Sequence, residues 1–287
     1  MKSPQLRLLL LALPGALFVL VFLVLPLLSI VVFSFWRTES YVMLPEWNLD
    51  NYRTILGEST YLTFIARSLA MALAVSLICL LYAWPCAYFI AKHGGRYRLI
   101  LVLLTAAPFL TGILLRITAM QQVLGPIGLI NLALTTFGIP PVEALMYTNL
   151  ASAIGLVYLW IPFMLVAVYL SLLNFNFELL EVAKVCGARP WRAFWAITWP
   201  LNWIGTAIGI VLVLVPTLAA TVTPRFLGGP NGALYGNILE HQFGATGTWA
   251  LGSAMGVVLF AVSLAAIWLV WHTVDLRRAG FTGGLGD

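Results

Sequence analysis

Long runs of apolar residues alternate with short polar segments along this 287-residue chain. Each run reaches the roughly 20 residues that a helix needs to cross the hydrocarbon core of a bilayer. Backbone polar groups in lipid must be satisfied internally, so runs of this length are expected to be helices. The predicted spans cover residues 8–36, 62–91, 99–122, 147–172, 202–222 and 249–274. The pattern predicts an all-α, polytopic membrane protein with about six transmembrane helices, organised as a single transmembrane domain over residues 1–287.

Composition agrees with this class, because 62% of the residues are hydrophobic and only 9% are charged. When the N-terminus is placed inside, ten of the fifteen Lys and Arg residues fall on the inner side of the membrane. These ten are Lys2, Arg7, Lys92, Arg96, Arg98, Lys184, Arg189, Arg192, Arg277 and Arg278. Both termini and the loop at residues 174–200 are therefore expected in the cytoplasm. The net charge of +5 is a topology signal and indicates no affinity for nucleic acid.

The segment at residues 174–200, called the charged loop below, interrupts the apolar pattern and predicts two short helices. Asn176 is a suitable N-cap for the first helix, and Glu178 and Glu181 lie near the positive end of its dipole. Gly187 is expected to end this helix in a left-handed conformation. Pro190 suits the first position of the second helix, where its missing N–H is not needed.

The spacing of several residues in the charged loop resembles the EAA motif of permease subunits in binding-protein-dependent ATP-binding-cassette (ABC) importers of type I. The matching positions are Glu181, Ala183, Gly187, Ile197 and Pro200. Members of the family usually have alanine and leucine where this chain has Val182 and Trp199. The resemblance implies that these five residues belong to the loop that couples the permease to its ATPase.

Further motifs resemble the spermidine/putrescine-type subfamily of these permeases, in the same order and at the same spacing. They lie at residues 49–52, 82–92, 115–116, 128–131, 227–229, 236–238, 242–243 and 249–252. The resemblance thus extends from about residue 49 to 255.

The resemblance implies the permease fold of type I importers, located in the bacterial plasma (inner) membrane among membrane lipids. It also implies two ATPase subunits, a second permease subunit that is related or identical, and an extracytoplasmic solute-binding protein. No cofactor is expected on this chain, and ATP and Mg²⁺ would bind to the ATPase subunits. The expected cargo is a polyamine or a related small organic solute, with an opine or an amino-acid-like solute as the alternative.

Four residues are candidates for the solute pathway or its gate. Arg116 is close to membrane depth, where a guanidinium is costly unless it faces protein or water. It is expected either to pair with a carbonyl or an acid such as Glu143 or Glu240, or to extend to the outer headgroups. A cation can also cross on aromatic faces. The aromatic candidates are Tyr88, Tyr158 and Trp160.

The sequence lacks the motifs that other functional classes require. There is no Gly-x-x-x-x-Gly-Lys-Ser/Thr phosphate loop and no converging catalytic set, so no enzymatic site is expected. Cys79 and Cys86 lie in one apolar span and Cys186 in the charged loop, while the three histidines are far apart, so no disulfide and no metal site are expected. An ion-driven secondary transporter is the remoter alternative, because the apolar spans contain no Asp or Glu away from their ends. A passive channel has no evident use for the charged loop.

Overall fold

The computed structural model describes residues 13–142 and 145–273, and almost all of its regular structure is helical. The described residues contain five helices that are long and apolar enough to cross a membrane, or up to six when one bent pair of helices counts as a single span. This result confirms the prediction of an all-α, polytopic fold. The described residues fall into two compact units, one formed by residues 13–63 with 238–262 and the other by residues 64–142 and 145–237 with 263–273.

The first unit begins with an apolar helix and a small hairpin. Its elements are the π-helical turn η1 (Leu20–Val24), α2 (Leu25–Phe33), β1 (Arg37–Glu39), β2 (Val42–Leu44) and α3 (Asp50–Gly57). The side chain of Asn51 donates hydrogen bonds to the carbonyls of Ser34 and Trp36, at 3.0 and 2.8 Å. The hydroxyl groups of Tyr52 and Ser34 are 2.7 Å apart. The motif at residues 49–52 therefore fastens α3 to the end of α2.

The second unit holds most of the remaining helices, and three helices contribute residues to both units. The shared helices are α4 (Ser59–His93), α13 (Tyr235–Gly244) and α14 (Trp249–His272). The others are η2 (Gly95–Tyr97), α5 (Arg98–Ala106), η3 (Ala107–Leu110), α6 (Ile113–Leu124), α7 (Leu129–Thr136), α8 (Asn149–Leu173), α9 (Glu178–Val185), α10 (Pro190–Ala193), η4 (Phe194–Thr198), α11 (Trp199–Leu201), α12 (Trp203–Leu218) and η5 (Pro224–Gly228).

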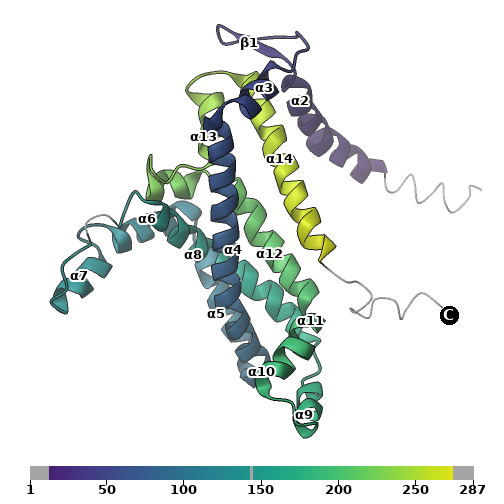
Figure 1. The fold of residues 1–287 in the computed structure, drawn as a ribbon, viewed down its shortest axis with the longest axis vertical. Coiled ribbons are helices and arrows are strands. Elements are labelled where there is room, and N and C mark those ends of the chain that lie inside the picture. Colours follow the sequence, from purple (N-terminus) through teal and green to yellow (C-terminus); the bar gives the residue numbers. More distant parts are fainter. Residues whose placement is uncertain (1–12, 143–144, 274–287) are drawn as a thin grey trace, which may run out of the picture. The chain divides into compact units, whose positions relative to one another are not determined.

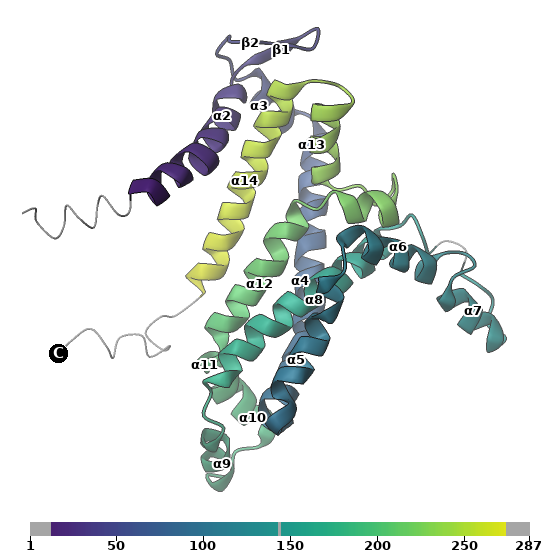
Figure 2. The same ribbon diagram turned by 180° about the vertical axis from the view of Figure 1, so that it is seen from behind.

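The core of the second unit is built from α4, α8 and α12. Val75, Cys79 and Ala87 of α4 pack in one buried cluster with Leu165 of α8 and Val213 of α12. Figures 1 and 2 both show α8 and α12 side by side. Helices in lipid gain little from hydrophobic burial against each other, so close packing of their surfaces must hold them together.

Glycines in α12 make this close packing possible. A Cβ atom at Gly205 would collide with Cβ of Ser171 in α8, and one at Gly209 would lie 2.7 Å from the sulfur of Met164. The two glycines are four residues apart, which is the Gly-x-x-x-Gly spacing typical of tightly packed transmembrane helices. The absence of side chains at these two positions brings α12 against α8.

The predicted span at residues 99–122 is wrong in one respect, because it is not a continuous helix. A 3₁₀ turn, η3, follows α5, and the chain is extended at Thr111 and Gly112 before α6 begins. Pro108 lies in this turn, where its ring and missing N–H disfavour a continuing helix. The break separates α5 from α6.

Candidate functional site

The first helix of the charged loop, α9, has Phe177 at its N-cap, so Asn176 lies one residue before the predicted capping position. Oδ1 of Asn176 accepts a hydrogen bond from the backbone N–H of Glu178 at 2.9 Å. Glu178 and Glu181 lie in the first turn, and Lys184 lies in the last. These charges complement the helix dipole and stabilise a helix of only eight residues.

Gly187 ends α9 in a left-handed conformation with φ of 82°, which confirms the predicted turn. The backbone N–H of Gly187 donates to the carbonyl of Lys184, and that of Ala188 donates to the carbonyl of Ala183, both at 2.9 Å. Pro190 then occupies the first turn of α10. The next helix therefore begins three residues after the glycine, in a new direction.

The motif residues of the charged loop divide into an exposed and a packed set. Glu181 and Val182 are exposed on α9, whereas Ala183 is buried with 9% of its surface accessible. Ile197 packs against the core cluster of α4, α8 and α12. Pro200 lies in the first turn of α11. Thus Ala183 and Ile197 hold the loop on the unit, and Glu181 and Val182 remain exposed.

The exposed face of α9 combines carboxylates with apolar side chains. Leu179, Val182 and Val185 are exposed by 41%, 60% and 89%, and they recur every third residue. Glu178 and Glu181 are exposed beside them. Among the described residues, no ion pair involves Glu181. A surface of this kind is suited to docking against another protein.

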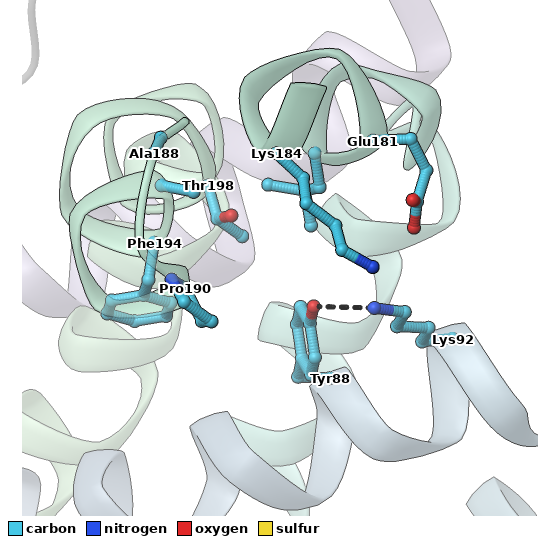
Figure 3. A pocket seen from close by; sticks show the side chains of 10 residues that line it. Tyr88, Lys92, Glu181, Lys184, Ala188, Pro190, Phe194 and Thr198 are labelled. Atoms are coloured by element: carbon cyan, nitrogen blue, oxygen red, sulfur yellow. Dashed lines mark hydrogen bonds between the residues drawn. The ribbon is translucent and has the colours of Figure 1, made fainter. Parts of the chain in front are cut away.

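A cavity of about 310 Å³ separates α9 from the end of α4 (Figure 3). Tyr88 and Lys92 enter it from α4, and Glu181 and Lys184 enter it from α9. Nζ of Lys92 donates a hydrogen bond to the hydroxyl of Tyr88 at 3.4 Å. The ring of Tyr88 packs edge-on against Phe177, with centroids 5.8 Å apart. Tyr88, a candidate pathway residue, thus lies in the same cavity as Glu181 of the charged loop.

Trp84 connects the second helix of the charged loop with α4 and α12. Its ring contacts Phe194 edge-on, with centroids 5.0 Å apart, and lies 5.6 Å from the ring of Trp199. Its Nε1 donates to Oγ1 of Thr206 in α12 at 3.1 Å. Trp84 of α4 therefore contacts the charged loop through its ring and α12 through a buried hydrogen bond.

The helix formed by α10, η4 and α11 meets α12 at a bend of 71°. Asn202 lies at the bend and is 1% exposed. Its Nδ2 donates to the carbonyl of Thr198 at 2.8 Å, and its Oδ1 accepts from Oγ of Ser171 in α8 at 3.0 Å. The amide therefore fastens the bend to α8.

Arg116 and Trp160 belong to one continuous aromatic and cationic cluster. Arg116 in α6 is only 8% exposed, and its Cζ lies 5.2 Å from the ring centroid of Phe109. Phe109 packs edge-on against Phe163 at 4.9 Å, and Phe163 lies 5.3 Å from the ring of Trp160. Nε of Arg116 and Nε1 of Trp160 are buried and have no hydrogen-bond partner among the described residues.

The remaining pathway candidates are not gathered into one site. Tyr158 lies on α8, half-buried, with no hydrogen bond or ring contact identified among the described residues. Of the two acids proposed as partners of Arg116, Glu143 lies outside the described residues and Glu240 belongs to the other unit. The four candidates therefore separate into the cluster around Arg116, the cavity at Tyr88, and Tyr158 alone.

Sequence reasoning missed Trp84, Asn202 and the glycine pair of α12. Trp84 and Thr206 are separated by 122 positions, so only the folded chain shows that they meet. Gly205 and Gly209 did carry a signal, because their spacing within an apolar run is a known packing motif.

Comparison with protein families finds one model that matches most of the chain. The family is described as "Binding-protein-dependent transport system inner membrane component", and its model matches residues 83–274. The chain is also similar to the spermidine/putrescine transport system permease protein PotB of Escherichia coli (strain K12). The two are 32% identical over 258 residues, which cover 89% of this chain and 93% of that relative. PotB of Haemophilus influenzae is 32% identical over 229 residues, 79% of each chain.

A solved structure has the same fold. It is a bacterial ABC transporter involved in the import of the acidic polysaccharide alginate, and it matches with a TM-score of 0.68 and 19% sequence identity. The match covers 96% of this chain and 96% of that chain. A second structure of an alginate ABC transporter, in complex with an alginate-bound periplasmic protein, matches with a TM-score of 0.66 and 18% identity, over 96% and 95% of the two chains.

Proposed function

This chain belongs to the family of binding-protein-dependent transport system inner membrane components, and from that premise we propose that its cargo is a polyamine of the spermidine and putrescine class. The chain is a multi-pass permease subunit of the inner membrane, with the fold of ABC importer permeases. It is a transport subunit and has no ATPase role of its own. The observation that supports the cargo is the 32% identity to PotB over 89% of the chain.

The proposed assembly follows from the family and from the position of the charged loop. Two ATPase subunits, which bind ATP and Mg²⁺, dock on the cytoplasmic loops of two permease subunits. We expect the second permease to be a related, distinct chain. An extracytoplasmic binding protein delivers the solute, as a periplasmic protein does in the alginate transporter complex. The excess of basic residues in the charged loop supports its cytoplasmic placement and that of both termini.

In this proposal α9 is the helix that inserts into the ATPase. Its exposed face offers Val182 and Val185 for apolar contact and the exposed carboxylate of Glu181 for a basic partner. The left-handed turn at Gly187 sets the angle between this face and the second helix. Two backbone hydrogen bonds, from the N–H groups of Gly187 and Ala188 to the carbonyls of Lys184 and Ala183, hold the turn.

The route from ATPase to pathway runs through the packed side chains beside the loop. When ATP closes the ATPase dimer, α9 and the second helix move together, because Gly187 joins them by a short turn. Phe194 and Trp199 then press on Trp84, which is hydrogen-bonded to Thr206 of α12. The displacement biases α4 and α12 toward the outward-facing state, and hydrolysis returns them.

The cluster around Arg116 is the proposed gate of the pathway, with Trp160 and Tyr158 as aromatic surfaces for the solute. The 8% exposure of Arg116 supports a role within the protein over extension to the headgroups. Its guanidinium lies over Phe109, and its buried Nε has no hydrogen-bond partner among the described residues. A gate of this kind changes state at small energetic cost.

The cargo is tested by the ligand of the binding protein that co-purifies with this subunit. We expect that protein to retain spermidine or putrescine, and the reconstituted complex to take up radiolabelled spermidine with ATP. An opine or amino acid in that pocket, together with absent spermidine uptake, would overturn the polyamine assignment. The same complex with an ATPase that cannot hydrolyse ATP is the matched control.

A further inference from the structure

Four tryptophans form a ladder along the second helix of the charged loop and the start of α12. They are Trp191, Trp195, Trp199 and Trp203. The centroids of successive rings are 5.4, 5.2 and 5.3 Å apart. Trp191 and Trp195 are exposed by 71% and 45%. Trp199 packs against Trp84 and the core cluster, and Trp203 begins α12 beyond the bend. The exposed rings of the second helix are therefore those of Trp191 and Trp195, four residues apart.

The exposed surface of this helix has an unusual composition. The exposed residues between positions 189 and 203 are Arg189, Pro190, Trp191, Arg192, Trp195, Ala196 and Leu201. None of them is an acid, an amide or a hydroxyl residue. A surface of tryptophan, aliphatic groups and arginine is poorly suited to water and is typical of helices that lie in a membrane interface.

The two helices of the charged loop differ in the charges of their exposed side chains. The exposed face of α9 carries Glu178, Glu181 and Lys184 beside its valines, so it presents charges of both signs. The second helix, Pro190–Leu201, is called the ladder helix below. The exposed charges on it and at its N-cap are all positive and come from Arg189 and Arg192. Mixed charge suits contact with a soluble protein, whereas unbalanced positive charge with tryptophan suits anionic lipid.

The direction of the ladder helix agrees with a lipid contact. Residues Pro190–Leu201 are bent by 71° from α12, which continues the same chain into an apolar helix. If α12 crosses the bilayer, a helix bent so strongly from it runs close to the membrane plane. The buried amide of Asn202, bonded to Thr198 and Ser171, holds this angle.

We propose that Pro190–Leu201 form an interfacial helix whose exposed Trp191 and Trp195, with Arg189 and Arg192, bind the anionic headgroups of the cytoplasmic leaflet. The helix rests against the lipid headgroups. The other helix, α9, stays in the aqueous phase, where the ATPase can bind it. The lipid contact holds this helix at the membrane surface while α9 moves with the ATPase. This inference rests on the proposed cytoplasmic placement of the charged loop and is independent of the cargo.

The test uses a fluorophore on each of the two helices. In a background of Cys79→Ala, Cys86→Ala and Cys186→Ser, Ala196→Cys places an environment-sensitive dye on the ladder helix, and Val182→Cys places it on α9. The labelled complexes are reconstituted in phosphatidylcholine vesicles with and without phosphatidylglycerol. Each is titrated with lipids that carry a nitroxide quencher at the headgroup or in mid-chain. Only complexes that retain ATP-driven uptake are compared.

We expect the dye at position 196 to lose fluorescence to the headgroup quencher more than to the mid-chain quencher, and more strongly when phosphatidylglycerol is present. Replacing Arg189→Gln and Arg192→Gln should remove the dependence on phosphatidylglycerol. The dye at position 182 should be insensitive to both quenchers. Three results would overturn the proposal. The first is that neither lipid quencher affects the dye at position 196. The second is that this dye is shielded from a water-soluble quencher only when the ATPase is bound. The third is that the lipid quenchers affect the dyes at positions 182 and 196 equally.

Discussion

Nε1 of Trp84 in α4 donates a hydrogen bond to Oγ1 of Thr206 in α12 at 3.1 Å, and both side chains are buried. The same indole ring packs against Phe194 and Trp199 of the charged loop. One side chain therefore touches the proposed coupling loop and bonds to a helix of the membrane core.

Trp84→Phe should weaken coupling while leaving the packing largely in place. The substitution removes the hydrogen bond to Thr206, whose net contribution is about 1 kcal/mol, and leaves a smaller ring against the loop. We expect a several-fold loss of binding-protein-stimulated ATP hydrolysis and a modest fall in thermal stability of the purified complex. Trp268→Phe is the control, because Trp268 is 65% exposed on α14. Equal behaviour of the two variants would contradict the role of Trp84.

Arg116→Ala should change the uptake of solute per ATP hydrolysed without loss of assembly. The substitution removes a buried guanidinium from the ring of Phe109, and a gate is biased by only a few kcal/mol. Arg53→Ala is the matched control, because Arg53 makes only an exposed ion pair with Asp50. Unchanged uptake, basal hydrolysis and coupling in the Arg116 variant would refute the gate assignment.

Gly209→Val should destabilise the packing of α12 on α8. Its Cβ would lie 2.7 Å from the sulfur of Met164 and 3.3 Å from Cβ of Ala167, so either the Met164 side chain or the two helices must shift. Overpacking of this kind costs about 1–3 kcal/mol. The measurement is thermal unfolding of the detergent-solubilised protein. Gly15→Val is the control, because nothing lies within 4 Å of a Cβ at that position. Equal stability of both variants would contradict the close contact.

Single cysteines should report which side of the membrane each loop occupies. In a cysteine-free background, Arg96→Cys and Arg189→Cys should resist impermeant thiol reagents in intact cells, whereas Asn231→Cys should react. All three positions are exposed, so accessibility reflects sidedness and is not limited by burial. Labelling at position 189 from outside would overturn both the topology and the proposed coupling loop.

Local features of the chain were predictable where a short stretch of sequence determines the geometry. Gly187 and Pro190 act within a few residues, through a left-handed turn and a fixed φ, and the structure has both. Asn176 accepts from the backbone N–H of Glu178, although Phe177 occupies the N-cap. Most spans also followed from apolar run length, with the exception of residues 99–122, where the structure has a break between α5 and α6.

Other features depend on contacts or turns that carry no short sequence signal. The hairpin of β1 and β2 turns at Ser40 and Tyr41, which have φ of 47° and 68° although neither is glycine or asparagine. The break between α5 and α6 was indicated by Pro108, but proline is also tolerated within membrane helices. The position of Tyr88 beside Glu181 required the fold, because the two lie on separate helices.

The most direct measurement is ATP hydrolysis stimulated by the solute-loaded binding protein in a reconstituted complex that carries Gly187→Val. A β-branched residue at φ of 82° is strained by about 1–3 kcal/mol, although nothing lies within 4 Å of its Cβ. We expect the complex to insert normally but to lose stimulated hydrolysis and uptake. Gly187→Asn should keep most activity, since asparagine tolerates this conformation. Full stimulation and uptake in the valine variant would contradict the assignment of residues 174–200 as the coupling loop.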